Sequence, residues 1–195
     1  MFLRKKIRLL FMLICGSFLF FPAGRAGEMP AAARREALRV IRFLDKLEAE
    51  SLLKKPSPLR RMDFTESELN SYIVYRIEME KSNVMKELRL KLFEANRIEG
   101  KIFVDLRGEK LSAGLKPQMN LYFEGVLVTQ NGQARLDFRK LFLESQSISP
   151  MFLDLVIFIA SKLSKFEAGS ILDWYALPLG IKDVRTGSGR IFVYY

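Results

Sequence analysis

Apolar residues recur every three or four positions from Pro30 to about Leu53, facing a row of arginines. Such spacing marks one face of an amphipathic helix, so we expect a helix over residues 30–53. Pro56 and Pro58 would end it, because proline cannot continue the helical hydrogen-bond ladder. The apolar face contains Ala37, Val40, Ile41, Leu44 and Leu47.

A second helix is predicted to begin after Thr65. The sequence Thr65-Glu66-Ser67-Glu68 is a capping box, in which Thr65 accepts a hydrogen bond from the Glu68 amide and Glu68 reaches back to the Thr65 amide. Leu69, Tyr72 and Ile73 then lie along one side of the helix.

After Ser82 the apolar period changes to two, which predicts antiparallel strands. In the first hairpin we expect a loop at residues 96–98, because one register then satisfies both apolar and charged pairs. The expected pairs are Leu92 with Ile102, Leu90 with Val104, Leu88 with Leu106, Arg89 with Asp105, and Glu87 with Arg107.

A second hairpin is predicted around Asn131-Gly132, a strong signal for a two-residue turn. Its strands would run over residues 119–129 and 133–143. Leu127 would face Leu136, Gly125 would face Phe138, and Glu124 would face Arg139. We expect a bulge near Lys140, since the same register sets Phe123 against Lys140.

Ser149-Pro150 is a good start for a helix over residues 151–166, which is apolar on nearly all sides. Residues 181–185 and 190–195 form a closing hairpin whose register stays open, because Arg185 would oppose Arg190. We therefore predict an α+β fold in which a long curved antiparallel sheet of about six strands wraps around the apolar helix, with two N-terminal helices.

The inward side of that sheet is expected to hold alternate apolar residues of the four long strands. These are Leu88, Leu90, Leu92, Ile102, Val104, Leu106, Leu121, Phe123, Leu127, Leu136 and Phe138.

The N-terminal residues account for part of the net charge and indicate export. The chain has 195 residues, a formal net charge of +10, one cysteine and no histidine. Residues 1–26 resemble a Sec-type secretory signal, with basic residues, a thirteen-residue apolar run from Leu9 to Phe21, and Gly24-Arg25-Ala26 for cleavage after Ala26. Without these residues the net charge falls to +5. We expect a periplasmic or secreted protein; retention of the segment as an anchor is the alternative. Cys15 lies inside the apolar run after Ile14, which argues against lipidation.

After the signal, residues 27–62 would form the amphipathic helix and a basic, proline-containing linker. Residues 63–195 would form a domain of helix and sheet of the lipid-binding kind. That domain holds neither cysteine nor histidine, which excludes disulfides, Ser-His-Asp triads and metal sites built on sulfur or imidazole. Ser161 and Lys165 are spaced like a Ser-Lys pair, but no oxyanion hole accompanies them. We predict no enzyme, no metal and no cofactor.

Asp154 is expected to face solvent or backbone amides near the start of its helix.

Residues 64–195 resemble small bacterial envelope proteins of the tubular lipid-binding (TULIP) type. The resemblance rests on Phe64-Thr65-Glu66-Ser67-Glu68-Leu69-Asn70-Ser71-Tyr72, two long hairpins, the apolar helix, and Leu177-Pro178-Leu179-Gly180-Ile181-Lys182-Asp183-Val184. It implies a sheet curved around a helix and lipid tails held in the groove between them.

The leading hypothesis is a non-catalytic envelope protein that binds a lipid or another long apolar ligand between sheet and helix. The alternative is a structural or interaction module with a tightly packed core. The expected apolar lining is Phe152, Leu155, Val156, Phe158, Ile159, Leu163, Leu121, Phe123, Leu136, Phe138 and Trp174.

Four basic residues near the linker, Lys54, Lys55, Arg60 and Arg61, are candidates for contact with an anionic membrane surface. A solvated linker is the alternative interpretation. Nucleic acid is not an expected partner, because no motif of basic and aromatic residues supports it. The sequence leaves the oligomeric state open.

Overall fold

The computed structural model describes residues 29–52, 58–79, 85–107, 117–154 and 169–195 and has an α+β fold. Its two helices with described bounds are α2 (Ala31–Leu52) and α3 (Glu66–Met79). The strands are β1 (Arg61–Thr65), β2 (Met85–Leu92), β3 (Arg97–Asp105), β4 (Gln118–Gln130), β5 (Gln133–Leu143), β6 (Gln146–Ser147), β7 (Tyr175–Ala176), β8 (Asp183–Gly187) and β9 (Arg190–Tyr194).

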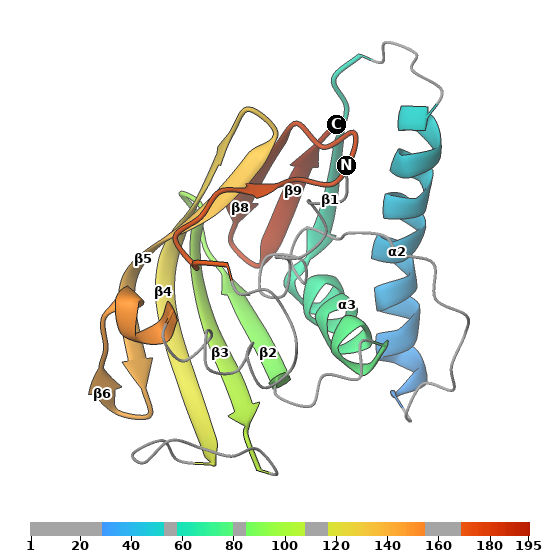
Figure 1. Ribbon diagram of the computed structural model, residues 1–195. Coiled ribbons are helices and arrows are strands. Elements are labelled where there is room, and N and C mark those ends of the chain that lie inside the picture. The colour runs from blue at the N-terminus through green and yellow to red at the C-terminus, as the bar shows by residue number, and fades with distance from the viewer. Residues whose placement is uncertain (1–28, 53–57, 80–84, 108–116, 155–168) are drawn as a thin grey trace, which may run out of the picture.

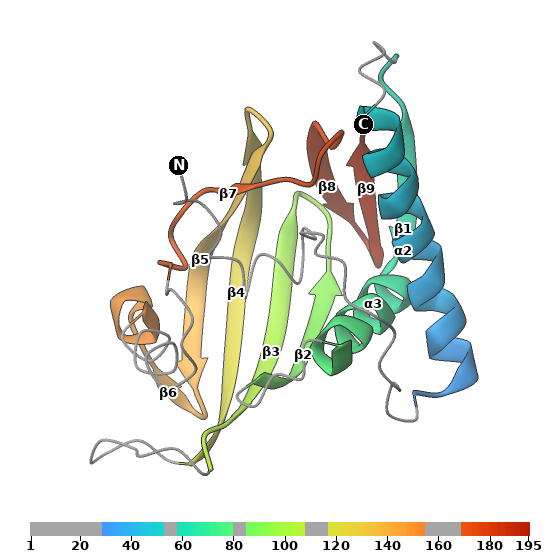
Figure 2. The same ribbon diagram turned by 45° about the vertical axis from the view of Figure 1, so that its right-hand side comes forward.

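The strands form two antiparallel sheets. The larger sheet is curled and has the order β2-β3-β4-β5-β6, with β7 pairing the other end of β5 (Figure 1). The smaller sheet has the order β1-β9-β8. It lies between the curled sheet and α2, as two views show (Figures 1 and 2).

Both N-terminal helices are confirmed. Helix α2 falls within the predicted residues 30–53. Helix α3 begins with the predicted capping box: the Thr65 amide donates to a Glu68 carboxylate oxygen at 2.8 Å, and the Glu68 amide donates to the Thr65 hydroxyl at 3.2 Å.

The second hairpin has the predicted register up to the predicted bulge. Asn131 and Gly132 have φ angles of 51° and 71°, as a type I′ turn requires. Leu127 pairs with Leu136 and Gly125 with Phe138, after which Glu124 pairs with Lys140. Arg139 is therefore the extra residue, and Glu124 faces Lys140 where Arg139 was expected.

The predicted register of the first hairpin is wrong. Leu92 pairs with Ile98, Leu90 with Gly100 and Leu88 with Ile102, so each partner on β3 lies four residues earlier than expected. The loop contains Ala95 and Asn96, with φ angles of 55° and 60°. A shift by an even number leaves every side chain on its face, so alternation could not distinguish the registers.

The charged residues of the first hairpin find ion-pair partners in the observed register as well. Arg89 pairs with Glu87 at 2.7 Å along the same strand, and Lys101 approaches Glu87 at 3.6 Å across the hairpin. Asp105 is satisfied locally by Arg107, whose Nη2 lies 2.6 Å away. The predicted pairs of Arg89 with Asp105 and of Glu87 with Arg107 are therefore replaced by nearer partners.

The closing hairpin is confirmed as β8 and β9. Arg185 lies opposite Phe192, so it does not oppose Arg190. The hairpin does not extend the curled sheet, because β9 pairs on its other side with β1, a strand that the sequence pattern did not indicate. The expected boundary between linker and domain, after residue 62, falls inside β1.

Both sheets and both helices share one core. Phe43 of α2 packs against Phe64 of β1 and Tyr195 beyond β9, with ring centroids 5.2 and 5.1 Å apart. Side chains of β2–β5 belong to the same buried cluster.

The start of the predicted apolar helix is described, but most of it is not. Residues 150–154 are helical, and the Phe152 amide donates to the Ser149 hydroxyl at 3.2 Å, as expected of an N-cap. Residues 155–168 lie outside the described residues, and with them the predicted wrapping of the sheet around this helix. Within the described ranges, neither helix has an apolar stretch long enough to cross a bilayer.

Candidate functional site

The candidate site is the inner face of the curled sheet, the side of β2–β5 whose side chains join the core. Strand alternation builds it, since successive side chains point to opposite sides. Its buried members are Met85, Leu88, Leu90, Leu92, Ile98, Ile102, Met119, Leu121, Phe123, Leu127, Ala134, Leu136 and Leu141. Within the described residues, the buried polar or charged side chains are those of Ser71, Asp105 and Thr186, and none of them belongs to this face.

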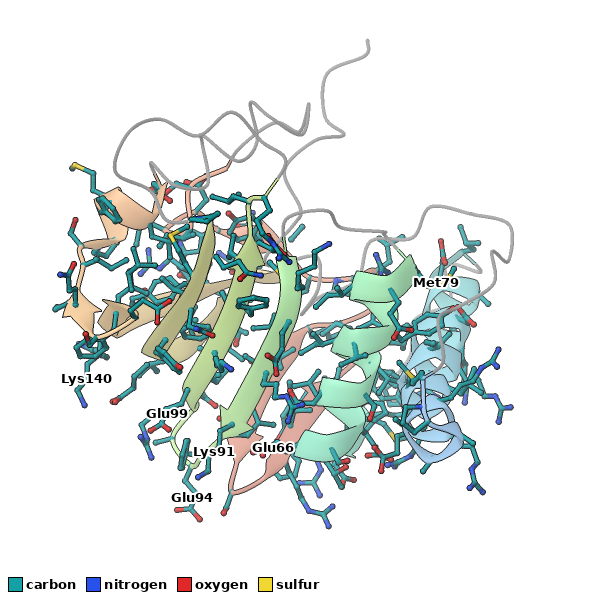
Figure 3. The ribbon with its side chains drawn as sticks, turned by 90° about the horizontal axis from the view of Figure 1, so that it is seen from below. Glu66, Met79, Lys91, Glu94, Glu99 and Lys140 are labelled. Atoms are coloured by element: carbon teal, nitrogen blue, oxygen red, sulfur yellow. The ribbon has the colours of Figure 1, made fainter. Side chains whose placement is uncertain are left out.

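The outer face of the same strands is charged. Lys91, Glu99 and Lys140 project from it, away from α3 (Figure 3). Lys140 forms an ion pair with Glu124 at 2.9 Å, and this pair holds the pKa of Glu124 below its ordinary value. The hydrogen bond from Lys140 is the largest cause, and partial burial opposes it. The two faces thus differ in chemistry, and only the inner one suits an apolar ligand.

Four of the predicted lining residues lie together on the inner face. Leu121, Phe123 and Leu136 are each no more than 5% exposed, and Phe138 is half-buried. The rings of Phe123 and Phe138 meet edge to face at 5.7 Å. Phe123 also covers Gly100, where an added Cβ would lie 2.1 Å from the ring, so a glycine is required there.

The other predicted lining residues are placed differently. Trp174 is half-buried against the Arg135 guanidinium, 4.7 Å from the ring centroid, on the side of β5 that faces away from the core. Phe152 is 37% exposed beside the more exposed Met151. Leu155, Val156, Phe158, Ile159 and Leu163 lie outside the described residues.

Leu153 is buried close to this face, although the sequence pattern did not predict it as a lining residue. It is 6% exposed and belongs to the same core cluster as Leu121 and Leu136. An apolar run on all sides of a helix carries no periodicity, so the sequence could not show that Leu153 points inward and Phe152 outward.

A small void opens beside the inner face, between α2 and the smaller sheet. Its volume is about 40 Å³, and its lining is apolar, drawn from residues such as Val40, Phe43, Phe64, Tyr72, Leu127 and Val193. Pockets for drug-sized ligands measure about 300–1,000 Å³. None of the residues that we predicted to line the ligand site lines this void, and the void is too small for an acyl chain.

Asp154 has the structural role that we expected. Its carboxylate accepts hydrogen bonds from the Ser170 hydroxyl at 2.6 Å and from the Ile171 amide at 2.8 Å. The nearby Tyr175 hydroxyl donates to the Ser170 carbonyl. Burial, assisted by the charges of Asp173 and Asp154, raises the pKa of Tyr175 to about 12, so this phenol stays protonated.

No metal-binding cluster of side chains occurs in the described ranges. There, no three acidic, histidine or cysteine side chains come close enough to hold a metal ion. Ser161 and Lys165, the pair with Ser-Lys spacing, lie outside those ranges.

Two of the four predicted membrane-contact residues can be placed. Arg60 forms an ion pair with Glu50 at 2.5 Å and lies over the Tyr195 ring, 4.8 Å from its centroid. Arg61 is exposed and lies 5.3 Å from the centroid of the Phe192 ring. Lys54 and Lys55 lie outside the described residues.

No protein-family model matches the chain, and no curated protein is similar to it in sequence.

Proposed function

We propose that this chain is a non-catalytic envelope protein that holds a lipid or another long apolar chain against the inner face of its curled sheet. The observation that carries the proposal is the composition of that face: the buried side chains that four long strands present to one side of a curled sheet are all apolar, and the rings of Phe123 and Phe138 meet among them. Such sites bind by shape and buried area with few polar groups. The resemblance to TULIP-type proteins supports the same function.

The location in the envelope is part of the proposal. The basic and apolar character of residues 1–26 supports export with cleavage after Ala26. The intact mass of the protein isolated from the periplasm tests this point, because removal of residues 1–26 would account for the whole difference from the full chain.

Native mass spectrometry of the exported protein tests the ligand. We expect a bound species of lipid mass that dissociates on collisional activation. Phe138→Trp adds volume on the inner face and should lower the occupied fraction. Phe142→Trp is the matched control, because Phe142 is also a half-buried phenylalanine of β5 but lies opposite Tyr122 on the outer face. An unliganded wild-type protein, or equal loss in both variants, would contradict the proposal.

A second candidate function is favoured by the packing. Leu121, Phe123 and Leu136 are already buried to at least 95%, and the void of about 40 Å³ between α2 and the smaller sheet is not lined by them. Such close packing suits a structural or interaction module of the envelope, which needs no space for a ligand in its core. For that function the exposed apolar residues Met151 and Leu172 become the contact surface, and the native mass spectrum should show a ligand-free protein.

A further inference from the structure

Three of the most exposed large apolar side chains in the described structure are leucines at one end of the molecule. Leu52, Leu59 and Leu179 are 72%, 63% and 65% exposed. They come from the last turn of α2, the segment before β1, and the loop before β8. We refer to these three residues as the leucine end.

Hydrogen bonds hold these segments at the same end of the fold. The Arg60 amide, next to Leu59, donates to the Tyr195 carbonyl at 2.8 Å, and the Lys182 amide donates to the Tyr194 carbonyl at 2.8 Å. The start of β1 and the loop before β8 therefore flank the same end of β9. Figures 1 and 2 both show the end of α2 and the start of β1 beside the C-terminus.

The loop before β8 is fixed against α2. The Ile181 amide donates to the Pro178 carbonyl at 3.0 Å, which closes a turn around Leu179 and Gly180. Gly180 has a φ of 88°, and a Cβ there would lie 3.7 Å from Leu47 of α2. Leu179 is thus presented to solvent by a turn with defined geometry.

The charged residues around the leucine end favour an anionic partner. Arg61 and Lys182 are exposed, and neither has an ion-pair partner among the described residues. The acids close to them in the chain or on α2 have other partners: Glu50 pairs with Arg60 at 2.5 Å and Lys46 at 3.7 Å, Asp183 with Arg185 at 2.8 Å, and Asp63 with Arg190 at 2.6 Å. Asp45 and Glu48 lie farther back, one to two turns before Leu52 on α2.

Exposed leucines flanked by cations and by tyrosines fit a membrane interface. Leucine side chains gain free energy on entering the boundary between headgroups and acyl chains, and cations near the surface are attracted by anionic lipids. Tyr194 and Tyr195 are half-buried at this end, where amphipathic rings suit the headgroup region.

From these contacts we propose that the leucine end docks on an anionic phospholipid bilayer, inserting Leu59 and Leu179 with Arg61 and Lys182 at the headgroups. This docking is independent of ligand binding on the inner face. Two other exposed apolar residues, Met151 and Leu172, have the acids Asp154 and Asp173 nearby in the chain, and no basic residue stands next to either of them in the described stretches of sequence around them.

Vesicle flotation of the exported chain tests the docking. We expect binding to phosphatidylcholine vesicles containing about a quarter phosphatidylglycerol, and weaker binding to pure phosphatidylcholine. The double variant Leu59→Ser, Leu179→Ser should lower the partition coefficient about tenfold or more, since both side chains would otherwise bury apolar area. Leu172→Ser, at a leucine that is 48% exposed elsewhere, is the matched control and should bind as the wild type does.

The charge contribution is tested separately. Arg61→Gln with Lys182→Gln should lower binding to the anionic vesicles about tenfold or more, and about 1 M salt should have a similar effect on the wild type. Arg139→Gln, at an exposed arginine of the β5 bulge, should change little.

Equal binding by the leucine variant and its control would overturn the proposal. So would sedimentation showing that the leucine end joins two copies of the chain while vesicles stay unbound. A protein without lipid in native mass spectrometry that still floats with vesicles would contradict the proposed function alone.

Discussion

At the scale of single residues, the Glu68 carboxylate has hydrogen-bond partners on both sides of the contact between α2 and α3. It caps α3 through Thr65 and accepts two hydrogen bonds from the Arg39 guanidinium, at 2.6 and 2.8 Å. Burial raises the pKa of Glu68, but the hydrogen bonds from Arg39 and Thr65 outweigh it, so the pKa lies below its ordinary value. One side chain thereby joins α2 to the start of α3.

We predict that Glu68→Ala lowers the free energy of unfolding by about 1–2 kcal/mol, because a cap and a partly exposed ion pair are lost. In the wild type the charged carboxylate is favoured in the folded state, so the unfolded chain binds more protons in acid. This stabilisation should be fully present above the ordinary pKa of glutamate, 4.5, and be lost progressively as the pH falls below it.

Urea unfolding at several pH values measures both effects. Glu68→Gln is the control, because glutamine can still cap the Thr65 amide but does not titrate. A Gln variant with the same acid dependence as the wild type would show that other carboxylates cause it.

At the scale of elements, side chains of α3 form hydrogen bonds with backbone groups along the free edge of β2. The Leu90 amide donates to the Asn70 side-chain oxygen, and the Asn70 amide nitrogen donates to the Leu90 carbonyl, both at 2.8 Å. The Leu92 amide donates to Glu66 at 2.7 Å. Asn70 therefore takes the place of a neighbouring strand, and an unpaired edge of this kind would otherwise be a template for aggregation.

We predict that Asn70→Ala lowers the free energy of unfolding by about 1–3 kcal/mol, because two backbone groups of Leu90 lose their partner. It should also increase aggregation at equal concentration, as measured by light scattering. Val74→Ala, on the exposed side of α3, should change the unfolding free energy by no more than about 0.5 kcal/mol. An Asn70 variant as stable and as soluble as this control would show that water satisfies the edge equally well.

At the scale of the whole molecule, α2 and the two sheets depend on one shared core. Phe43 lies where they meet, in contact with the rings of Phe64 and Tyr195. The turn between β2 and β3 is tied to β8, because the Thr186 hydroxyl donates to the Phe93 carbonyl at 2.7 Å and the Thr186 amide to the Asn96 side chain at 2.9 Å. These links couple the smaller sheet to the curled one.

We predict that Phe43→Ala lowers the free energy of unfolding by about 3–5 kcal/mol, through lost burial and the cavity left behind. Because the core is continuous, circular dichroism and Trp174 fluorescence should report the same single transition in urea. Arg42→Ala, the exposed neighbour on α2, should be nearly neutral. Separate transitions for the two probes would mean that the sheets unfold independently.

The sequence predicted the features that short-range interactions determine. The capping box needs only Thr65 and Glu68, and the Asn131-Gly132 turn sets the register of β4 and β5 because its length leaves no freedom. Alternation also placed Leu121, Phe123, Leu136 and Phe138 on one face. Their role in binding a ligand stays a prediction, as does the export signal.

Tertiary structure alone decided the features that join distant segments. The register of β2 and β3 was one of several with identical faces, and the turn at Ala95 and Asn96 selected it. Strand β1 exists because β9, near the other end of the chain, pairs with it, and no local pattern records a partner that far away. The exposure of Leu59 and Leu179 likewise follows from the tertiary structure, in which no described element packs over them. Burial is a property of the assembled fold and not of a residue's neighbours in sequence.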